Sequence, residues 1–203
     1  PSLSLLLKSE VFKIEKKQDK LLEVYDLMLA SKKTETIGYR GLMELNLKNQ
    51  DYHHAFLYGE KLFNLNPNIE KLYETLTYIC AKTKNWNQLI LLSDKAYYNK
   101  SISKNILLEN KSIGYFEIAK IKSDSNLQDA IINITKALDL KKNFPPFIKL
   151  HLELVAKTNN LFLLKKLVKK YWLSNPIYLV RSIITQIIID NNLGQLIFIN
   201  QII

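Results

Sequence analysis

The feature that most constrains this fold is a helical pattern that recurs along the chain with a period near 34 residues. The clearest copy, residues 49–67, reads NQDYHHAFLYGEKLFNLNP, with a polar turn, a small residue at Ala55 and a closing proline at Pro67. The later copies, aligned on the small residue, centre on Leu89, Ala130 and Leu164. The successive intervals are 34, 41 and 34 residues. A period of this length predicts stacked supersecondary units, because no single unit can bury its apolar face alone.

Each copy is preceded by a second helical pattern with i, i+3, i+4, i+7 spacing, which is one face of an α-helix. The four sets are Tyr39, Leu42, Met43 and Asn46; Tyr73, Leu76, Thr77 and Cys80; Gly114, Glu117, Ile118 and Ile121; and Ile148, His151, Leu152 and Val155. About seven extra residues before the third copy are interpreted as an insertion at 104–110. An Asp or Asn before each second helix is expected to cap it, and a closing proline suits the first turn of the next helix.

Helix-turn-helix units of this length, with a small residue on the second helix and a terminal proline, are typical of tetratricopeptide repeats. We therefore predict an all-α, right-handed superhelical solenoid of antiparallel helix pairs, forming one domain over residues 1–203. Its expected parts are repeats at about 3–35, 36–69, 70–103, 111–144 and 145–176, followed by terminal helices at 177–203. Leu89 and Leu164 stand where the small residue is usual, so the helix spacing there is left open.

The charge of the chain does not by itself indicate a nucleic-acid partner. The formal net charge is +10, but the basic residues are almost all lysine, with arginine only at Arg40 and Arg181. Nucleic-acid readers favour arginine for bidentate contacts, whereas abundant Lys, Asn and Ile are expected from an AT-rich genome. Most aromatic residues fall at apolar repeat positions, which predicts core packing rather than base stacking. An anionic partner remains the alternative interpretation of the charge.

Cysteine content and apolar runs indicate neither a disulfide framework nor a membrane span within these residues. The single cysteine, Cys80, excludes an intramolecular disulfide and is expected to be reduced and buried. The run SLSLLL near the start is far shorter than the ~20 apolar residues of a spanning helix. The apolar tail is interrupted by Arg181, Asp190 and a turn, which favours two short buried helices. Because the chain begins at Pro1 without a methionine, we expect it to be part of a longer protein.

One segment resembles a particular repeat family. Gly38-Tyr39-Arg40-Gly41-Leu42 opens a first helix, Asp51 and Ala55 follow on the second, and Trp86 stands in the next turn. Together with NLQDAIINITKALDLKKNFPP and KKYWLSNP further on, these residues resemble the tetratricopeptide region of the HemY family, from about Leu3 to Pro176. The resemblance implies a non-catalytic scaffold or regulator associated with haem (protohaem) biosynthesis. It also implies an N-terminal membrane anchor that this chain lacks, with the repeats at the bacterial inner membrane on the cytoplasmic side, and no catalytic residue.

Candidate metal, haem and catalytic residues are few. Adjacent helical residues point about 100° apart, so His53 and His54 cannot share an ion as residues four apart could. His151 falls on an inter-helix face and is expected to be a packed imidazole. We predict no metal, no cofactor and no enzyme activity, since no phosphate-binding loop, nucleophile elbow or zinc-protease motif is present. A haem-binding or transfer protein, using a histidine, Cys80 or a tyrosine as axial ligand, remains an alternative.

The most concrete candidate site is the concave groove that the first helices of stacked repeats line. The predicted partner-binding residues are Arg40, Glu44, Lys48, Lys71, Tyr78, Lys82, Tyr115, Phe116, Lys122, Lys149 and Lys157. Lys48, Lys82 and Lys157 take equivalent positions near the end of a first helix, so stacking would align them for an acidic peptide or helix. This favours a generic repeat adaptor with a protein partner, and neither nucleic acid nor a small-molecule substrate. The alternative is that lysine there only complements the helix dipole.

Overall fold

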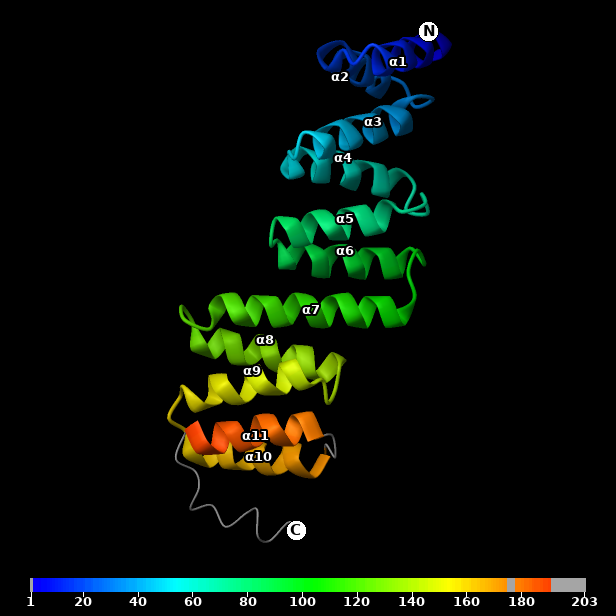
Figure 1. Cartoon of the computed structure of the whole chain (residues 1–203). Coiled ribbons are helices and arrows are strands. Elements are labelled where there is room, and N and C mark those ends of the chain that lie inside the picture. The colour runs from blue at the N-terminus through cyan, green and yellow to red at the C-terminus, as the bar shows by residue number, and fades with distance from the viewer. Residues whose placement is uncertain (1, 175–177, 191–203) are drawn as a thin grey trace. The chain divides into compact units, whose positions relative to one another are not determined.

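The structure, a computed structural model, describes residues 2–174 and 178–190 and divides the chain into two compact units (Figure 1). Unit 1 covers residues 1–102 and unit 2 covers residues 103–203. The helices of unit 1 are α1 (Ser2–Ile14), α2 (Gln18–Leu29), α3 (Glu35–Lys48), α4 (Tyr52–Leu65), α5 (Leu72–Lys82) and α6 (Trp86–Tyr98). Those of unit 2 are α7 (Lys104–Lys122), α8 (Leu127–Leu140), α9 (Pro145–Ala156), α10 (Leu161–Ser174) and α11 (Tyr178–Asp190). No strand occurs in the described residues, so the predicted all-α class is confirmed.

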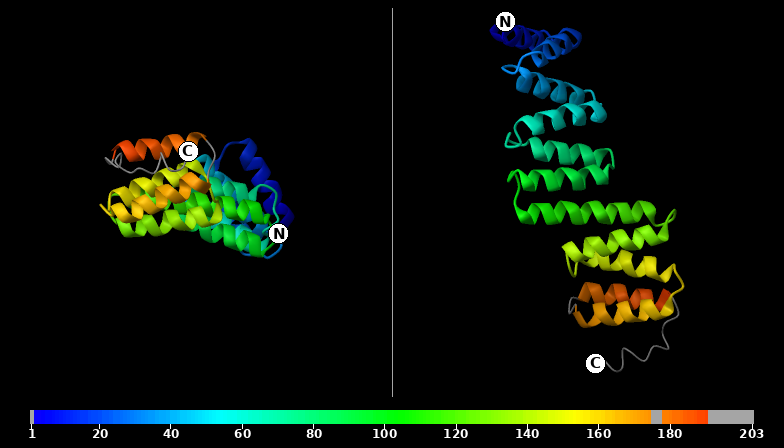
Figure 2. Two further views of the ribbon diagram at one scale, coloured as in Figure 1. Left: turned by 90° about the horizontal axis from the view of Figure 1, so that it is seen from below. Right: turned by 180° about the vertical axis from the view of Figure 1, so that it is seen from behind.

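Within each unit, consecutive helices run antiparallel and lie side by side as tetratricopeptide-type hairpins (Figures 1 and 2). We call the first helix of each hairpin helix A and the second helix B. The helices A are α1, α3, α5, α7 and α9, and the helices B are α2, α4, α6, α8 and α10. Helix α11 packs against both helices of the last hairpin and contributes Ile184, Ile187 and Ile188 to the core of unit 2.

The repeat register read from the sequence corresponds to burial in the structure. The four aligned helix B positions are all buried, with exposed fractions of 0% for Ala55, 4% for Leu89, 0% for Ala130 and 1% for Leu164. Leucine is therefore accommodated at two positions where the repeat usually has a small side chain. Leu89 and Leu164 fill space that an alanine would leave empty, so these hairpins tolerate the departure from the usual pattern.

The turns inside the first three hairpins share one backbone geometry. Lys16, Gln50 and Lys84, spaced 34 residues apart, all take the left-handed conformation, with φ of 55°, 60° and 54°. In the second turn the Gln50 N–H donates to the Leu47 carbonyl at 3.0 Å, and the Asp51 N–H donates to the Asn46 carbonyl at 2.9 Å. Lys16 and Lys84 repeat both bonds, so α1, α3 and α5 each end in a Schellman motif.

The residue that completes such a turn also begins the next helix. Asp51 accepts a hydrogen bond from the His54 N–H at 3.1 Å, and Asn85 accepts one from the Gln88 N–H at 3.3 Å. Asn126 does the same for the Asp129 N–H at 3.0 Å. The prediction that Asp or Asn caps helix B is thus confirmed at these sites. Because one residue ends helix A and caps helix B, a three-residue turn is enough to reverse the chain.

Helix α7 differs from the prediction. Residues 104–110, interpreted as an insertion, form its first turns, so α7 has 19 residues rather than beginning near 111. The expected buried face of Gly114, Glu117, Ile118 and Ile121 is also wrong in part, because Ile121 is 59% exposed. The buried side of α7 carries the small residues Ser112, Gly114 and Ala119. Small side chains there let α7 lie against α8 over much of its length.

Prolines behave in two ways at the ends of the hairpins. Pro145 and Pro146 occupy the first positions of α9, as expected for a residue without an N–H. Pro67 instead lies in a loop, since α5 begins only at Leu72. The chain crosses that loop with Lys71 in the left-handed conformation. Pro176, which was expected to play the same part, lies outside the described residues.

Two glycines explain how closely α3 approaches α2. A Cβ atom on Gly38 would lie 2.8 Å from the Tyr25 carbonyl oxygen, and one on Gly41 would overlap the Tyr25 ring. Both glycines belong to the segment that carries the family resemblance. Helix packing alone therefore accounts for them, because any side chain at Gly41 would displace the buried ring of Tyr25.

No helix within residues 2–174 and 178–190 is both long enough and apolar enough to cross a bilayer. Of the apolar tail that was expected to form two short helices, α11 is described, and residues 191–203 lie outside the described part.

The turn geometry predicts that Lys84→Gly stabilises the protein by about 1 kcal/mol. A left-handed conformation costs an L-residue roughly 1–2 kcal/mol and costs glycine almost nothing, and the glycine gain is partly offset by chain entropy. Lys84→Ala keeps the strain and should change the free energy of unfolding by less than half as much. Lys61→Gly, in the exposed middle of α4, is the matched control and should destabilise the protein. Urea unfolding followed by circular dichroism measures all three, and a loss of stability in Lys84→Gly would contradict the assignment.

Candidate functional site

Two hollows lie between successive helices A of unit 1, each about 250 Å³ in volume. The α1–α3 hollow is lined by residues of α1, α2 and α3 together with Lys16 of the first turn: Phe12, Lys13, Lys16, Gln18, Leu21, Tyr25, Gly41, Glu44, Leu45 and Lys48. The α3–α5 hollow is lined by α3, α4, α5 and the loop before α5: Arg40, Met43, Glu44, Leu47, Leu62, Ile69, Glu70, Lys71, Leu72 and Thr75. Glu44 lines both, so the hollows adjoin across α3.

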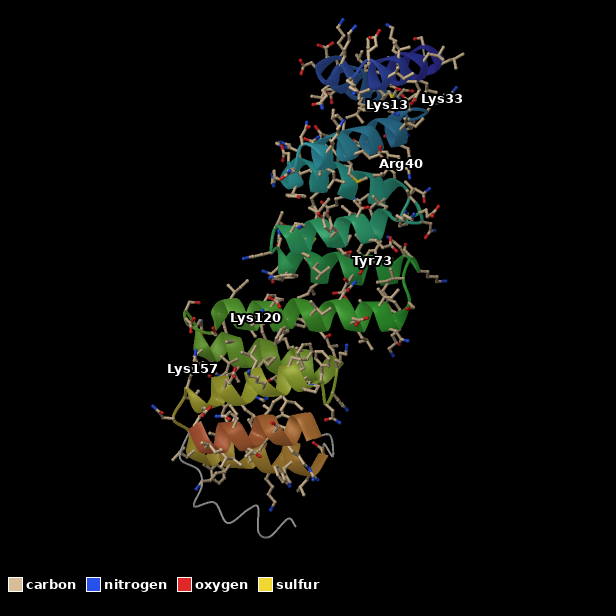
Figure 3. The ribbon with its side chains drawn as sticks, viewed as in Figure 1. Lys13, Lys33, Arg40, Tyr73, Lys120 and Lys157 are labelled. Atoms are coloured by element: carbon tan, nitrogen blue, oxygen red, sulfur yellow. The ribbon has the colours of Figure 1, made fainter. Side chains whose placement is uncertain are left out.

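The structure brings together four of the predicted groove residues. Arg40, Glu44 and Lys71 line the α3–α5 hollow, and Lys48 lines the α1–α3 hollow. Arg40 comes within 3.8 Å of the Glu44 carboxylate, one helical turn away, and both side chains are more than half exposed. An exposed ion pair of this length holds neither group firmly, so both remain available to a ligand. Figure 3 marks Arg40 on α3 and Lys13 on α1.

The remaining predicted residues of unit 1 lie elsewhere on its surface. Tyr78 meets the ring of Tyr52 edge-on, with centroids 6.4 Å apart, and the Lys82 ammonium lies 5.5 Å from the Tyr78 ring centroid. Neither Tyr78 nor Lys82 lines the α1–α3 or the α3–α5 hollow. They form a small exposed aromatic and cationic cluster at the ends of α4 and α5.

In unit 2 the predicted basic residues have carboxylate partners. Lys122 Nζ lies 2.6 Å from the Asp129 carboxylate, and Lys149 Nζ lies 3.8 Å from Glu153. Lys157 Nζ lies 2.9 Å from Asp124, and this hydrogen bond lowers the pKa of the Asp124 carboxyl. Lys122 and Lys157 are therefore less available to an external acidic ligand than Lys48 or Lys71 of unit 1. Lys149 lies as far from its carboxylate as Arg40 does from Glu44, so it is held no more firmly than Arg40. The sequence could not show the Lys157–Asp124 pair, since the two residues are far apart along the chain.

The two predicted groove aromatics of unit 2 also differ from expectation. Tyr115 and Phe116 are half-buried and pack against the core of unit 2. The ring of Phe116 lies 4.9 Å from that of Phe147, which is itself 2% exposed. Both aromatics are therefore part of the packing of unit 2 rather than a free surface.

Charge is unevenly divided around the hollows of unit 1. Their linings include five cationic side chains, Lys13, Lys16, Arg40, Lys48 and Lys71, and two carboxylates, Glu44 and Glu70. Beneath the charged rims lie apolar side chains from helices A and B. The contribution of α1 and its turn, Phe12, Lys13 and Lys16, was not predicted from the sequence, because the first repeat copy is degenerate. The 34-residue spacing of Lys16 and Gln50 was the signal that could have found it.

The adjacent histidines behave as surface residues. His53 and His54 are exposed at the start of α4, and the His54 Nδ1 lies 2.7 Å from Asp51 Oδ2. This side-chain hydrogen bond lowers the pKa of the Asp51 carboxyl. In the part of the chain that the structure describes, no three His, Cys, Asp or Glu side chains are grouped as metal ligands.

Cys80 and His151 are packed inside the protein. Cys80 is 1% exposed, and burial raises the pKa of its thiol to about 12, so it stays protonated and unreactive. The His151 Nδ1 lies 2.8 Å from the Tyr171 hydroxyl, and burial lowers the pKa of the imidazole to about 4. The expected packed imidazole is confirmed, and the bond to Tyr171 occupies one of its ring nitrogens.

No family model and no curated protein sequence matches this chain. Among solved structures it is similar to MamA, residues 41 to the end, from Desulfovibrio magneticus RS-1, with 13% identity, a TM-score of 0.40, and coverage of 89% of this chain and 96% of MamA. It is also similar to YrrB, described as a tetratricopeptide protein with an unusual peptide-binding site, at 13% identity and a TM-score of 0.40, covering 89% of each chain. Likeness at this level supports no statement about the function of this chain.

The His151 environment predicts a pH dependence of stability. The folded-state pKa of about 4 lies below the unfolded value of 6.5, so between these values the unfolded chain binds a proton that the folded chain does not. The contribution of His151 to the free energy of unfolding is therefore fully present above pH 6.5. It falls by roughly 3 kcal/mol as the pH drops to 4.

His151→Gln keeps a hydrogen-bonding partner for Tyr171 and cannot titrate, so its stability should fall less steeply between pH 6.5 and 4 than that of the wild type. His53→Gln, at an exposed site, is the matched control and should follow the wild type. Thermal melts at half-unit pH steps measure the difference, and parallel curves for all three proteins would refute the assignment.

Proposed function

We propose that this chain is a non-catalytic adaptor that binds an acidic peptide or helix across the α1–α3 and α3–α5 hollows of unit 1. The observation that carries the proposal is the pair of adjoining hollows whose linings hold five cationic groups and two carboxylates above apolar floors. Cationic rims attract an acidic segment and speed its association, while apolar floors accept its side chains.

The contrast between the units supports placing the site in unit 1. Lys48 and Lys71 have no carboxylate within ion-pair distance among the described residues, whereas Lys122 and Lys157 in unit 2 each have one. A carboxylate close to a lysine offsets part of its positive charge, so the lysine attracts an external carboxylate less strongly. Lys48 is the last residue of α3, and the dipole of α3 also favours a lysine there. The dipole does not account for the hollow beside Lys48.

Charge reversal of the α3–α5 hollow tests the proposal. The probe is a fluorescein-labelled 12-residue peptide of four Glu-Glu-Leu repeats, followed by fluorescence anisotropy at low and at 0.5 M salt. Arg40→Glu with Lys71→Glu should weaken binding about tenfold or more and flatten its salt dependence. Lys32→Glu with Lys61→Glu makes the same change in net charge at exposed sites away from both hollows and should have less than about a threefold effect. Equal losses in the two double variants would show that only overall charge matters.

A narrower proposal rests on the sequence resemblance to the HemY family. In it, the parent protein is anchored in the bacterial inner membrane, and these repeats scaffold or regulate enzymes of haem biosynthesis on the cytoplasmic side. The support is the segment from Gly38 to Leu42 with Asp51, Ala55 and Trp86, of which the two glycines are also explained by packing against Tyr25. The general adaptor fits the structure equally well.

Surface plasmon resonance with purified ferrochelatase from the same organism tests the haem link. The narrower proposal expects saturable binding. The double variant Arg40→Glu with Lys71→Glu should weaken it, and the double variant Lys32→Glu with Lys61→Glu should leave it unchanged. Absence of binding to ferrochelatase and to its pathway neighbours would remove the haem link and leave the adaptor. In a parallel haem titration we expect no Soret shift, because His151 and Cys80 are buried and the exposed neighbours His53 and His54 point about 100° apart, so they cannot both bind one iron. A one-to-one shift would favour the alternative of a haem-binding protein.

A further inference from the structure

The floor of the α1–α3 hollow is apolar and formed by three helices. Phe12 of α1 is half-buried, and Leu21 of α2 and Leu45 of α3 are each 7% exposed. The Tyr25 ring lies against Gly41, which has no side chain to hold it away from α3. With a volume of about 250 Å³, the hollow is large enough for one large side chain but not for a whole folded element.

The rim of the same hollow is cationic. Lys13 comes from the end of α1, Lys16 from the turn after it and Lys48 from the end of α3. Lys13 Nζ is bonded to Glu10 at 2.6 Å. Lys16 and Lys48 have no ion-pair partner among the described residues, so their ammonium groups are available to a ligand. Glu44 is the single carboxylate of the lining, and it is directed partly to Arg40 on its own helix.

This combination of surfaces selects among ligands. A bare inorganic anion would meet the lysines but would gain nothing from Phe12, Leu21 and Leu45. A purely apolar peptide would fill the floor but leave two ammonium groups unpaired. A large apolar side chain with carboxylates beside it satisfies both parts, since burial of the side chain is favourable and the carboxylates lie at the rim, where water still reaches them.

We propose that the α1–α3 hollow is an anchor pocket that takes one large apolar side chain, phenylalanine or leucine, from a peptide whose neighbouring carboxylates bind Lys16 and Lys48. This inference rests on the proposed function, because it names the feature of the acidic peptide that unit 1 recognises. The inference adds that the α1–α3 hollow selects its peptide by the shape of one side chain as well as by charge.

Three capped five-residue peptides test the pocket on the full chain. The first has phenylalanine between two pairs of glutamates, the second has alanine in place of phenylalanine, and the third keeps phenylalanine but replaces all glutamates with glutamine. Binding is followed by methyl NMR of leucine-labelled protein. The first peptide should shift the Leu21 and Leu45 methyl signals through the ring current of its phenylalanine. We expect the second and the third to bind at least about tenfold more weakly.

Two sets of variants link the effect to the rim and the floor. Lys16→Gln with Lys48→Gln removes the two free charges and should weaken the first peptide about tenfold, whereas Lys32→Gln with Lys61→Gln should leave its affinity within about threefold. Gln18→Trp places a large ring at the mouth of the hollow and should abolish the methyl shifts. Melting temperatures of all variants near that of the wild type show that each one folds.

The outcomes separate this inference from the proposed function. Equal binding of the phenylalanine and alanine peptides overturns the anchor pocket, and the adaptor still stands if charge reversal at Arg40 and Lys71 weakens the longer probe. Equal binding of the glutamate and glutamine peptides overturns the role of the rim. If 10 mM inorganic phosphate produces the same methyl shifts as the peptide, the hollow is a simple anion site and the inference is wrong.

Discussion

Within each unit, the structure depends on the burial of the apolar faces that neighbouring helices pack against one another. Ala55, Ala96 and Ala130 on helices B have no exposed surface, and they allow neighbouring backbones to approach closely. At the α2–α3 contact the small residue is on helix A instead, where Gly41 receives the Tyr25 ring. Removing one helix would expose the apolar side of its neighbours, so stability comes from adjacent hairpins rather than from any one of them.

The short turns inside the first three hairpins decide how each helix B folds back on its helix A. A Schellman motif followed at once by an N-cap reverses the chain in three residues and leaves little freedom in the hairpin angle. The two hollows form between successive helices A of unit 1, where α3 faces α1 on one side and α5 on the other. All seven left-handed residues in the described ranges are Lys, Gln or Asn rather than glycine. This strain is consistent with a composition that has only five glycines.

Pairing decides which part of a lysine-rich chain can bind an acidic partner. Both units carry lysine at the ends of helices A, and helix dipoles favour it in both. In unit 2 Asp129 pairs with Lys122 within the α7–α8 hairpin, and Asp124 pairs with Lys157 of the following hairpin. In unit 1 Lys16, Lys48 and Lys71 have no such partner among the described residues, and apolar hollows lie beside them. The location of the carboxylates thus says more about where an acidic partner can bind than the net charge does.

The amino-acid sequence determined the helix pairs, their period and their caps, because these follow from local spacing and from residues such as Asp51 and Asn85 that act within one turn. It also determined that Cys80 and His151 are buried, since both fall on the apolar face of a helix. The start of α7 at Lys104 also had a local signal, because Ser103 caps the helix. Only the tertiary structure decided that Phe116 belongs to a core and that Lys157 is paired. It also decided that Phe12, Leu21 and Leu45 meet at one hollow. These features depend on contacts between residues more than a helix apart, and the sequence carries no local signal for such contacts.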